Sequence, residues 1–172
     1  GTYSRLLLCS AGEKPVLVKA TRLEPSRPEA ARRAAREILI TMQAGELKTA
    51  FVLQSFGWMK AAGEVFNILE YLPGGDVGLL IDRAGALSPS AARFYCGCVA
   101  LGLESLHKLD WLHRDVKPEN FCLARDGYAK LCDLGFARKL PEDGRAQTLL
   151  GTPEYLAPEV RGRLAAATLC AS

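Results

Sequence analysis

The chain has 172 residues, of which 49% are hydrophobic and 24% charged, and its formal net charge is +3. This composition is typical of a globular protein and excludes a disordered or fibrous chain. Basic residues form no long block and no apolar run is long enough for a membrane span, so neither nucleic-acid binding nor a transmembrane segment is expected. The six cysteines fit no zinc spacing, and we interpret them as reduced thiols of a cytoplasmic protein.

The first part of the chain predicts strands and a single helix. The turn-rich letters SAGEK separate two apolar segments, which is typical of a hairpin. Farther on, Pro28 and Glu29 suit the first turn of a helix, and glycine suits its end. The expected elements are a hairpin of Gly1–Leu8 and Pro15–Lys19, a helix from Ser26 or Arg27 to Gly45, and strands at Phe51–Phe56 and Glu64–Leu72.

After the chain-breaking letters PGGD the pattern becomes mainly helical. Ser88 and Pro89 form a cap and a first turn for a long helix with a wide apolar face, which we expect to pack into a core. The chain beyond Asp133 is predicted to be irregular. The expected elements are helices at Asp76–Arg83 and from Ser90 to about Leu109, whose apolar face includes Phe94, Cys98, Leu101, Gly102 and Leu106, and a hairpin of Phe121–Leu123 and Tyr128–Cys132.

This order of elements predicts an α+β fold with two lobes. Residues 1–69 would form a small β-rich lobe, residues 70–76 a hinge, and residues 77–172 a mainly helical lobe. A cleft between two such lobes is a common place for a ligand.

The segment LHRDVKPEN, at Leu112–Asn120, has the order H-R-D-x-x-x-x-N of a phosphoryl-transfer catalytic loop. Such a reaction needs an acid facing the acceptor hydroxyl, a cation near the phosphates and oxygen ligands for Mg²⁺. We expect Asp115 to accept the hydroxyl proton and Lys117 to neutralise the transferred group. Asn120 and Asp133 are the expected Mg²⁺ ligands.

Two further residues complete this constellation. Lys19 ends a predicted strand and Glu37 lies in the middle of a predicted helix, so the two can pair and direct the ammonium at the ATP phosphates. Each of these residues also has a simpler explanation when taken singly: Lys19 and Glu37 as surface charges, Asp133 as a turn aspartate and Thr148 as an exposed loop hydroxyl. We favour the functional interpretation because all of the simpler explanations would have to hold at once, for residues that occur in this order. Cys132 is either a thiol lining the nucleotide site or a small buried residue at a strand end.

Three motifs, HRDVKPEN, DLGFAR and GTPEYLAPE, together resemble the eukaryotic protein kinases. The combination of KPEN with GTPEYLAPE is similar to serine/threonine kinases rather than tyrosine kinases. The stretches EYLPGGD, ARFYCGCV and GYAKLCDLGFARKL most resemble the cyclic-nucleotide-dependent kinases of the AGC group, particularly the cGMP-dependent type. The resemblance extends from about Gly1 to Val160.

The resemblance implies an ATP site in the small lobe and the hinge. Gly1 to Leu6 match the second half of the glycine-rich loop, with Tyr3 at its tip, while Lys19 and Glu37 match the conserved ion pair. The implied nucleotide-binding residues are Gly1, Tyr3, Leu6, Leu17, Lys19, Glu37, the gatekeeper Leu69, and Glu70 and Leu72 of the hinge.

The resemblance also implies an activation loop. Thr148 matches its phosphorylation site, and the phosphate would be bound by Arg114, with Arg138 as a second candidate. Thr152 matches the threonine that braces the catalytic Asp and Lys.

Protein or peptide substrates with basic residues near Ser or Thr are expected. Asp76, Glu119 and Glu154 match acids that face substrate arginines in related kinases, and Leu149, Pro153 and Leu156 would form an apolar pocket beside them.

Some positions depart from the family pattern. Leu17 replaces the alanine that lies over adenine and can crowd the purine, whereas Leu134 replaces the Phe of D-F-G and keeps an apolar plug. The chain also lacks the first glycine of the phosphate loop and the helices that follow Ala157-Pro158-Glu159 in the family. We therefore expect a truncated kinase domain with weak or no activity alone. The alternative is a non-catalytic, pseudokinase-like binding module.

Overall fold

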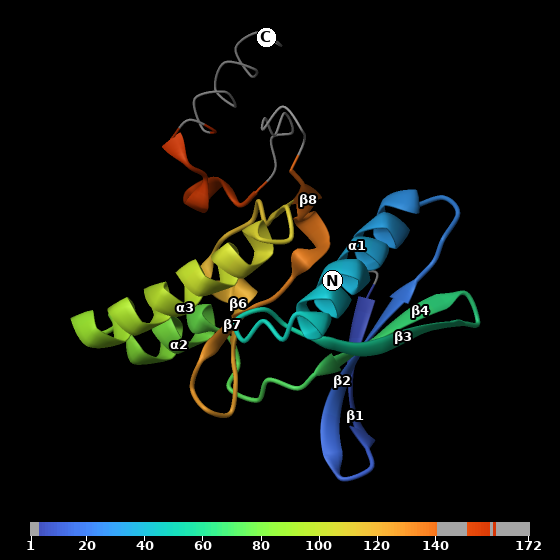
Figure 1. The fold of residues 1–172 in the computed structure, drawn as a ribbon, viewed down its shortest axis with the longest axis horizontal. Coiled ribbons are helices and arrows are strands. Elements are labelled where there is room, and N and C mark those ends of the chain that lie inside the picture. Colours follow the sequence, from blue (N-terminus) through green and yellow to red (C-terminus); the bar gives the residue numbers. More distant parts are fainter. Residues whose placement is uncertain (1–3, 141–150, 159, 161–172) are drawn as a thin grey trace, which may run out of the picture.

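The computed structural model describes residues 4–140, 151–158 and 160. Figure 1 shows a β-sheet with the helix Pro28–Glu46 beside it, and the helices Val77–Ala84 and Pro89–His107 farther from the sheet, beyond a small hairpin. This arrangement confirms the predicted two-lobed α+β fold. The small lobe consists of β1 (Ser4–Ala11), β2 (Lys14–Arg22), α1 (Pro28–Glu46), β3 (Ser55–Ala61) and β4 (Glu64–Glu70).

The sheet of the small lobe is antiparallel, with the order β1-β2-β4-β3. Its first hairpin turns at Gly12, whose φ of 63° is one that glycine adopts without strain. In the register of the sheet, Lys19 on β2 lies between Leu6 on β1 and Asn67 on β4. The predicted hairpin is therefore confirmed, and it places Lys19 on a central strand.

The strand predicted at Phe51–Phe56 is wrong, because the strand is Ser55–Ala61. The apolar letters at 51–53 belong to a core segment: Leu131 N donates to Phe51 O (2.8 Å), and Leu53 N donates to Leu131 O (2.9 Å). The true strand is at the edge of the sheet and leaves Phe56 65% exposed, so apolarity did not mark it. The predicted second strand, Glu64–Leu72, ends two residues early, at Glu70.

The second lobe begins with two capped helices. The Asp76 carboxylate accepts a hydrogen bond from Leu79 N (2.8 Å), and the Ser88 hydroxyl accepts one from Ala91 N (3.3 Å), as expected of N-cap residues. The elements are α2 (Val77–Ala84), α3 (Pro89–His107), β5 (Trp111–Leu112), β6 (Phe121–Leu123), β7 (Ala129–Leu131) and β8 (Arg138–Lys139), with 3₁₀ turns at Pro118–Asn120, Leu134–Phe136 and Pro153–Tyr155.

The buried face of α3 is narrower than its sequence predicts. Cys98, Gly102 and Leu106 are buried, but Phe94 and Leu101 are each 43% exposed. The Phe94 ring instead packs beside the ring of Tyr128, with centroids 5.2 Å apart. The prediction is therefore wrong for Phe94 and Leu101 and confirmed for Cys98, Gly102 and Leu106. Cys96 on the same helix is also exposed, whereas Cys98 is buried.

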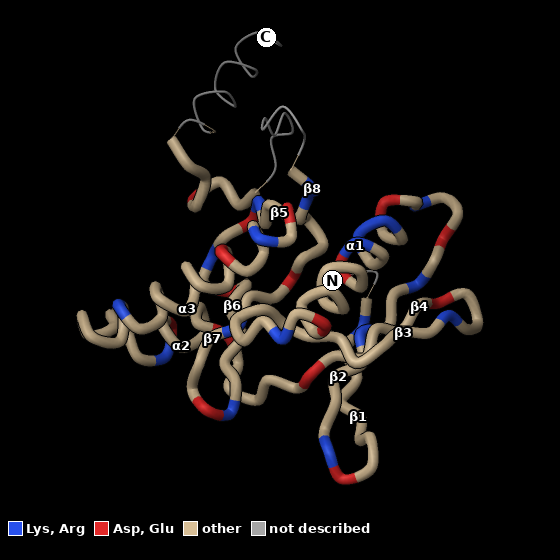
Figure 2. Tube along the Cα trace, in the orientation of Figure 1, with Lys and Arg blue, Asp and Glu red and all other residues tan. Residues whose placement is uncertain are grey.

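The main core lies where α3, the β6–β7 hairpin and the segment 51–53 meet. It continues past the hairpin to Leu134 and Ala137, and it reaches α1 through Ile40 and Ala44. No helix within the described ranges is long and apolar enough to cross a lipid bilayer. Lys, Arg, Asp and Glu are interspersed along the described trace (Figure 2). The fully buried core members include Val52, Leu106, Ala129, Leu131 and Leu134.

Two glycines of α3 provide a matched test of this packing. A Cβ at Gly102 would lie 2.9 Å from Phe51 O and 3.3 Å from Leu131 Cβ, whereas a Cβ at Gly97 would meet nothing within 4 Å. We expect Gly102→Ala to lower the free energy of unfolding by about 1–3 kcal/mol because backbone must shift. Gly97→Ala should raise it by up to about 1 kcal/mol through helix propensity. Urea titration measures both, and equal effects would contradict the close packing of α3.

Candidate active site

A cavity of about 1070 Å³ lies between the sheet of the small lobe and the loops of the second lobe. Its walls come from β1, β2, α1, the chain that follows β4, and the loops around β6 and β7. It brings together the predicted residues Leu6, Leu17, Lys19, Glu37, Leu69, Glu70, Leu72, Asp76, Glu119, Asn120 and Asp133.

The predicted ion pair of the small lobe is present. Lys19 Nζ lies 2.6 Å from Glu37 Oε2, and only 6% of the Glu37 side chain is exposed. Burial opposes the charged form of Lys19, but the charge of Glu37 and its hydrogen bond outweigh it and raise the pKa of the ammonium. The charge of Asp133 acts in the same direction. Lys19 is therefore a fixed cation that faces an acid from the other lobe.

The part of the cavity near the chain after β4 is apolar. Leu53, Leu69 and Cys132 form a buried cluster, and Leu17, Leu72 and Cys122 pack against it. Cys132 fits both predicted alternatives, because it is buried at a strand end and its side chain lines the cavity. The side chain of Leu17, which is larger than the alanine that it replaces in the family pattern, occupies part of this apolar region.

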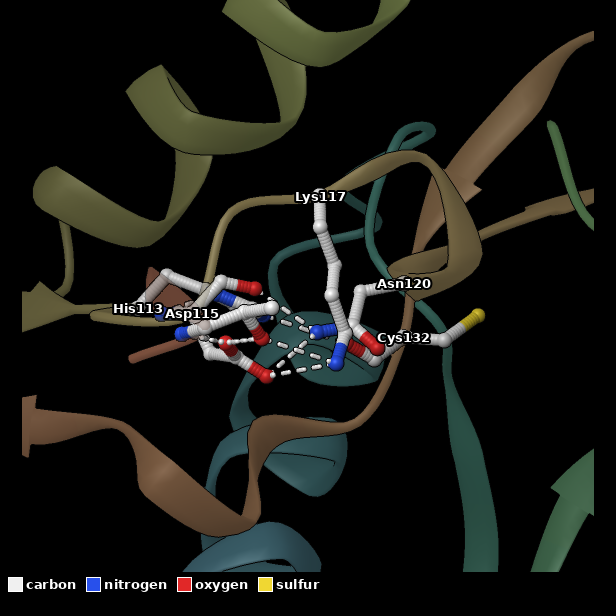
Figure 3. A network of polar contacts seen from close by, with 6 residues as sticks. His113, Asp115, Lys117, Asn120 and Cys132 are labelled. Atoms are coloured by element: carbon white, nitrogen blue, oxygen red, sulfur yellow. Dashed lines mark hydrogen bonds and ion pairs between the residues drawn. The ribbon is translucent and has the colours of Figure 1, made fainter. Parts of the chain in front are cut away.

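Asp115 is held by donors from its own loop and from Thr152, 37 residues farther along the chain. Thr152 donates from its backbone N (2.9 Å) and its hydroxyl (2.7 Å) to Asp115 Oδ1. Asn120 Nδ2 donates to Asp115 Oδ2 (3.1 Å), and Lys117 Nζ lies 3.4 Å from the same oxygen. Lys117 also donates to the Thr152 hydroxyl (3.0 Å). Figure 3 shows the ammonium of Lys117 directed at this carboxylate, while the thiol of Cys132 points away from it.

These contacts determine the charge of Asp115. Burial alone would raise the pKa of the carboxyl, but the hydrogen bonds from Thr152 and Asn120 and the charge of Lys117 outweigh it and lower the pKa. Asp115 is thus a carboxylate at neutral pH, with Oδ1 occupied by Thr152 and Oδ2 less tightly bound.

His113 fixes the backbone of the same loop. Its Nδ1 accepts a hydrogen bond from Asp115 N (3.2 Å), so its Nε2 carries the proton and donates to Cys132 O (3.2 Å). Burial lowers the pKa of the imidazole, which keeps it neutral. His113 therefore joins the loop at Asp115 to the end of β7.

The two predicted metal ligands fit a divalent cation. Asn120 uses its amide nitrogen on Asp115, including a 2.7 Å bond to Asp115 O, so its amide oxygen is left as an acceptor. Asp133 is exposed in the same cavity and has a left-handed backbone, with φ of 47°. An amide and a carboxylate oxygen beside space for phosphates are what Mg²⁺ commonly uses. Within the described ranges no three His, Cys, Asp or Glu side chains gather around a potential metal position.

Three arginines hold the turn that follows Asp133. Arg36 on α1 donates to Gly135 O (2.6 Å), Arg114 Nε donates to Phe136 O (2.9 Å), and the Arg33 guanidinium lies 4.2 Å from the centroid of the Phe136 ring. Arg33 and Arg36 were not predicted as site residues, although both lie within about one turn of Glu37 on the same helix. They connect α1 directly to the loop that carries Asp133.

Arg114 has an unusual environment for a cation. Its Nη1 is buried and has no hydrogen-bond partner among the described residues. Burial lowers the pKa of its guanidinium, and the charges of Arg138 and Arg36 lower it further. Like charges gathered around a buried donor favour the binding of an anion.

Other predicted residues lie apart from this group or outside the description. Gly1, Tyr3 and Thr148 fall outside the described residues, as does Leu149. Glu154 and Pro153 are exposed in the 3₁₀ turn Pro153–Tyr155, and neither lines the cavity.

The comparison with protein families decides the classification. The model described as "Protein kinase domain" matches residues 1–168. The chain belongs to the protein kinase family. This membership accounts for the order of the three motifs and for the two-lobed fold around the cavity.

Several kinases are similar over about two thirds of the chain. A "cAMP-dependent protein kinase, catalytic subunit-like" protein of Caenorhabditis briggsae is 37% identical over 118 residues, which is 69% of this chain and 30% of that protein. Human "cAMP-dependent protein kinase catalytic subunit PRKX" is 40% identical, over 67% of this chain and 32% of its own length. "cGMP-dependent protein kinase egl-4" of Caenorhabditis elegans is 39% identical, over 67% of this chain and 15% of its own.

These relatives confirm the predicted resemblance to cyclic-nucleotide-dependent kinases, both cAMP-dependent and cGMP-dependent. The chain spans less than a third of the length of each of these three kinases over the aligned region.

The hydrogen bonds on Asp115 predict a pH dependence of stability. A carboxyl whose pKa is lowered on folding stabilises the protein above its unfolded pKa, and this stabilisation is lost as the pH falls through the folded pKa. The window therefore begins near the ordinary value of 3.8 and extends below it. We expect Thr152→Val, which removes one donor, to raise the pKa of Asp115 and to move the acid loss of stability to higher pH.

Carboxyl-carbon NMR titration of Asp115 measures the shift, and the free energy of unfolding against pH measures its consequence. Thr152→Ser retains the hydroxyl and is the control. An unchanged Asp115 pKa in Thr152→Val would contradict the role of this hydrogen bond.

Proposed function

We propose that this protein is an ATP- and Mg²⁺-dependent serine/threonine kinase that phosphorylates proteins with basic residues near the acceptor. The observation that carries the proposal is the Asp115 carboxylate, which is bound by Thr152, Asn120 and Lys117 beside a cavity that contains the Lys19–Glu37 pair. An oriented base, a cation for phosphates and oxygen ligands for a metal are the requirements of phosphoryl transfer.

In this proposal the ATP phosphates lie between the two lobes. Lys19, held by Glu37, binds the α- and β-phosphates, and the apolar cluster that includes Leu69 binds adenine. Asn120 and Asp133 hold Mg²⁺, which neutralises charge on the phosphate oxygens when it is bound.

The substrate hydroxyl binds at Asp115. Because Thr152 occupies Oδ1 with two hydrogen bonds, Oδ2 is the oxygen that orients the hydroxyl and accepts its proton. A carboxylate with a lowered pKa is a weak base, so the proton transfers late, when the hydroxyl oxygen has begun to bond to phosphorus. Lys117, shared between Asp115 and Thr152, neutralises the phosphoryl group during transfer.

Acids near the mouth of the cavity support a basic substrate. Asp76 and Glu119 both line the cavity, and Glu119 is exposed. One oxygen of Asp76 caps α2, which leaves the second oxygen for a guanidinium. Glu154 is exposed on the turn that follows Thr152 and would provide a third acid.

Phosphorylation of Thr148 is the proposed activating event. The buried, unpaired Nη1 of Arg114 and the neighbouring charge of Arg138 support binding of a phosphate dianion. Because Arg114 also donates to Phe136 O, a phosphate bound there would stabilise the turn that follows Asp133.

A second candidate is a binding module that takes up nucleotide without transferring phosphate. The presence of Leu17 in the apolar part of the cavity favours it, because the added side-chain volume crowds the position proposed for adenine.

Replacement of the proposed base separates the two candidates. Asp115→Asn should lower phosphate transfer to an Arg-rich Ser/Thr peptide by about 100-fold or more, since general-base contributions have this size. Transfer is measured with radiolabelled ATP in this chain and in the longest natural form of the protein. Asp82→Asn, at an exposed position on α2, is the matched control. Mg·ATP binding without any transfer in the unsubstituted forms would favour the binding module.

The crowding by Leu17 is testable through affinity. Leu17→Ala should lower the Kd for Mg·ATP by about tenfold, because it removes side-chain volume at the proposed adenine position. Leu8→Ala is the matched control: Leu8 pairs with Leu17 in the sheet but is 61% exposed and lies outside the cavity. Calorimetric titration gives both values. Weaker binding by Leu17→Ala would mean that Leu17 contacts the base favourably.

A further inference from the structure

A second ion pair, Glu70–Lys130, joins the two lobes at the cavity, which Glu70 lines. Lys130 Nζ lies 2.9 Å from Glu70 Oε1 and 2.7 Å from Oε2, and the side chains are only 16% and 19% exposed. Glu70 is the last residue of β4 in the small lobe, whereas Lys130 lies on β7 in the second lobe. The catalytic proposal gives no role to either side chain of this pair.

Glu70 is also fixed to the other passage of the chain between the lobes. Its Oε1 accepts a hydrogen bond from Gln54 N (3.0 Å), and its own N donates to Gln54 O (3.1 Å). Gln54 directly follows the segment 51–53, which is hydrogen-bonded to β7. Both chain passages between the lobes therefore meet at a single carboxylate.

The connection after Glu70 is otherwise weakly held. The segment 71–76, here called the connector, is anchored at its far end, where Gly74 N donates to Leu123 O (3.0 Å) and Leu123 N donates to Gly75 O (2.8 Å). Within the described ranges, residues 71–73 make no backbone hydrogen bond outside the connector. These three residues can bend, and the Glu70–Lys130 pair bridges them.

We infer that Glu70 and Lys130 are positioning residues that form a latch, which sets the angle between the lobes. The angle matters because Lys19 belongs to the small lobe, whereas Asn120 and Asp133 belong to the second lobe. If the lobes opened about residues 71–73, Lys19 would move away from the proposed metal ligands, while the structure inside each lobe would not change. The effect on nucleotide binding rests on the proposed function, but the effect on the lobe angle does not.

Two exposed thiols, one on each lobe, allow a direct measurement of the distance between the lobes. Cys9 lies on β1 and Cys96 on α3, and both are exposed, so spin labels on them report the distance between the lobes. Cys122→Ser and Cys170→Ser remove two further cysteines of the chain before labelling. Pulsed electron paramagnetic resonance of the full 172-residue chain should show a broader distance distribution in Lys130→Met than in the parent, and a narrow one restored in Lys130→Arg.

A matched control distinguishes a latch from a loss of stability. The Arg5–Glu64 pair has similarly short contacts, of 2.7 and 2.8 Å, but joins two strands of the same sheet. Glu64→Gln should therefore leave the distance distribution unchanged. An unchanged distribution in Lys130→Met, or equal broadening in Glu64→Gln, would overturn the inference.

The second measurement is nucleotide affinity. If the latch maintains the competent lobe angle, Lys130→Met should raise the Kd for Mg·ATP by about threefold to tenfold, in proportion to the lost competent population. Glu64→Gln should not raise it. Unaltered affinity in Lys130→Met, with binding intact in the parent, would overturn the proposed link to the site. If the parent itself binds no Mg·ATP, the proposed function fails, and the distance measurement still decides whether the latch exists.

Discussion

The arrangement around the cavity depends on keeping a buried carboxylate charged. Removing the Asp115 carboxylate from water costs free energy unless donors replace the lost hydration. Thr152 supplies two of these donors from 37 residues farther along the chain. The same bonds that keep Asp115 ionised therefore dock the segment 151–158 onto the loop of residues 113–120. A change that neutralises the carboxyl weakens this docking together with the chemistry.

The lobes differ in how they compensate their buried acids. In the small lobe Glu37 has one strong partner, Lys19, on a neighbouring element, so its position depends on α1 remaining close to β2. In the second lobe Asp115 has several partners, including its loop neighbours Lys117 and Asn120. Arg33 and Arg36 connect the two arrangements, because they lie on α1 and contact the turn after Asp133. Movement of α1 would therefore alter both lobes.

The elements that the sequence analysis predicted correctly had strong local signals. Asp76 and Ser88 are side chains suited to helix caps, and both helices begin where these residues predict. The predicted strand at Phe51–Phe56 failed because burial in the other lobe, rather than strand pairing, explains its apolar letters. The prediction failed for Phe94 and Leu101 on α3 because the helical period identifies a face but not which neighbours cover it.

The order of the sequence motifs predicted more of the residues around the cavity than local signals for helices, strands and turns could. Lys19, Glu37, Asn120 and Asp133 were predicted together and line one cavity. Glu70 was predicted only as a nucleotide-binding residue of the hinge, and Lys130 was not predicted at all. A contact between side chains 60 residues apart has no local signal in the sequence, so its partners become visible only when the strands are placed.

The close approach of the connector to β6 limits which sequences this fold accepts. A side chain at Gly74 would place its Cβ 2.5 Å from Leu123 Cβ and 2.9 Å from Leu123 O, too close for any L-amino acid without backbone displacement. Mutational tolerance in the connector should therefore differ sharply between neighbouring positions. Tyr71 and Leu72 line the cavity, so their substitution should change which ligands it accepts, whereas Gly74 is restricted by geometry alone, whatever ligand the cavity binds.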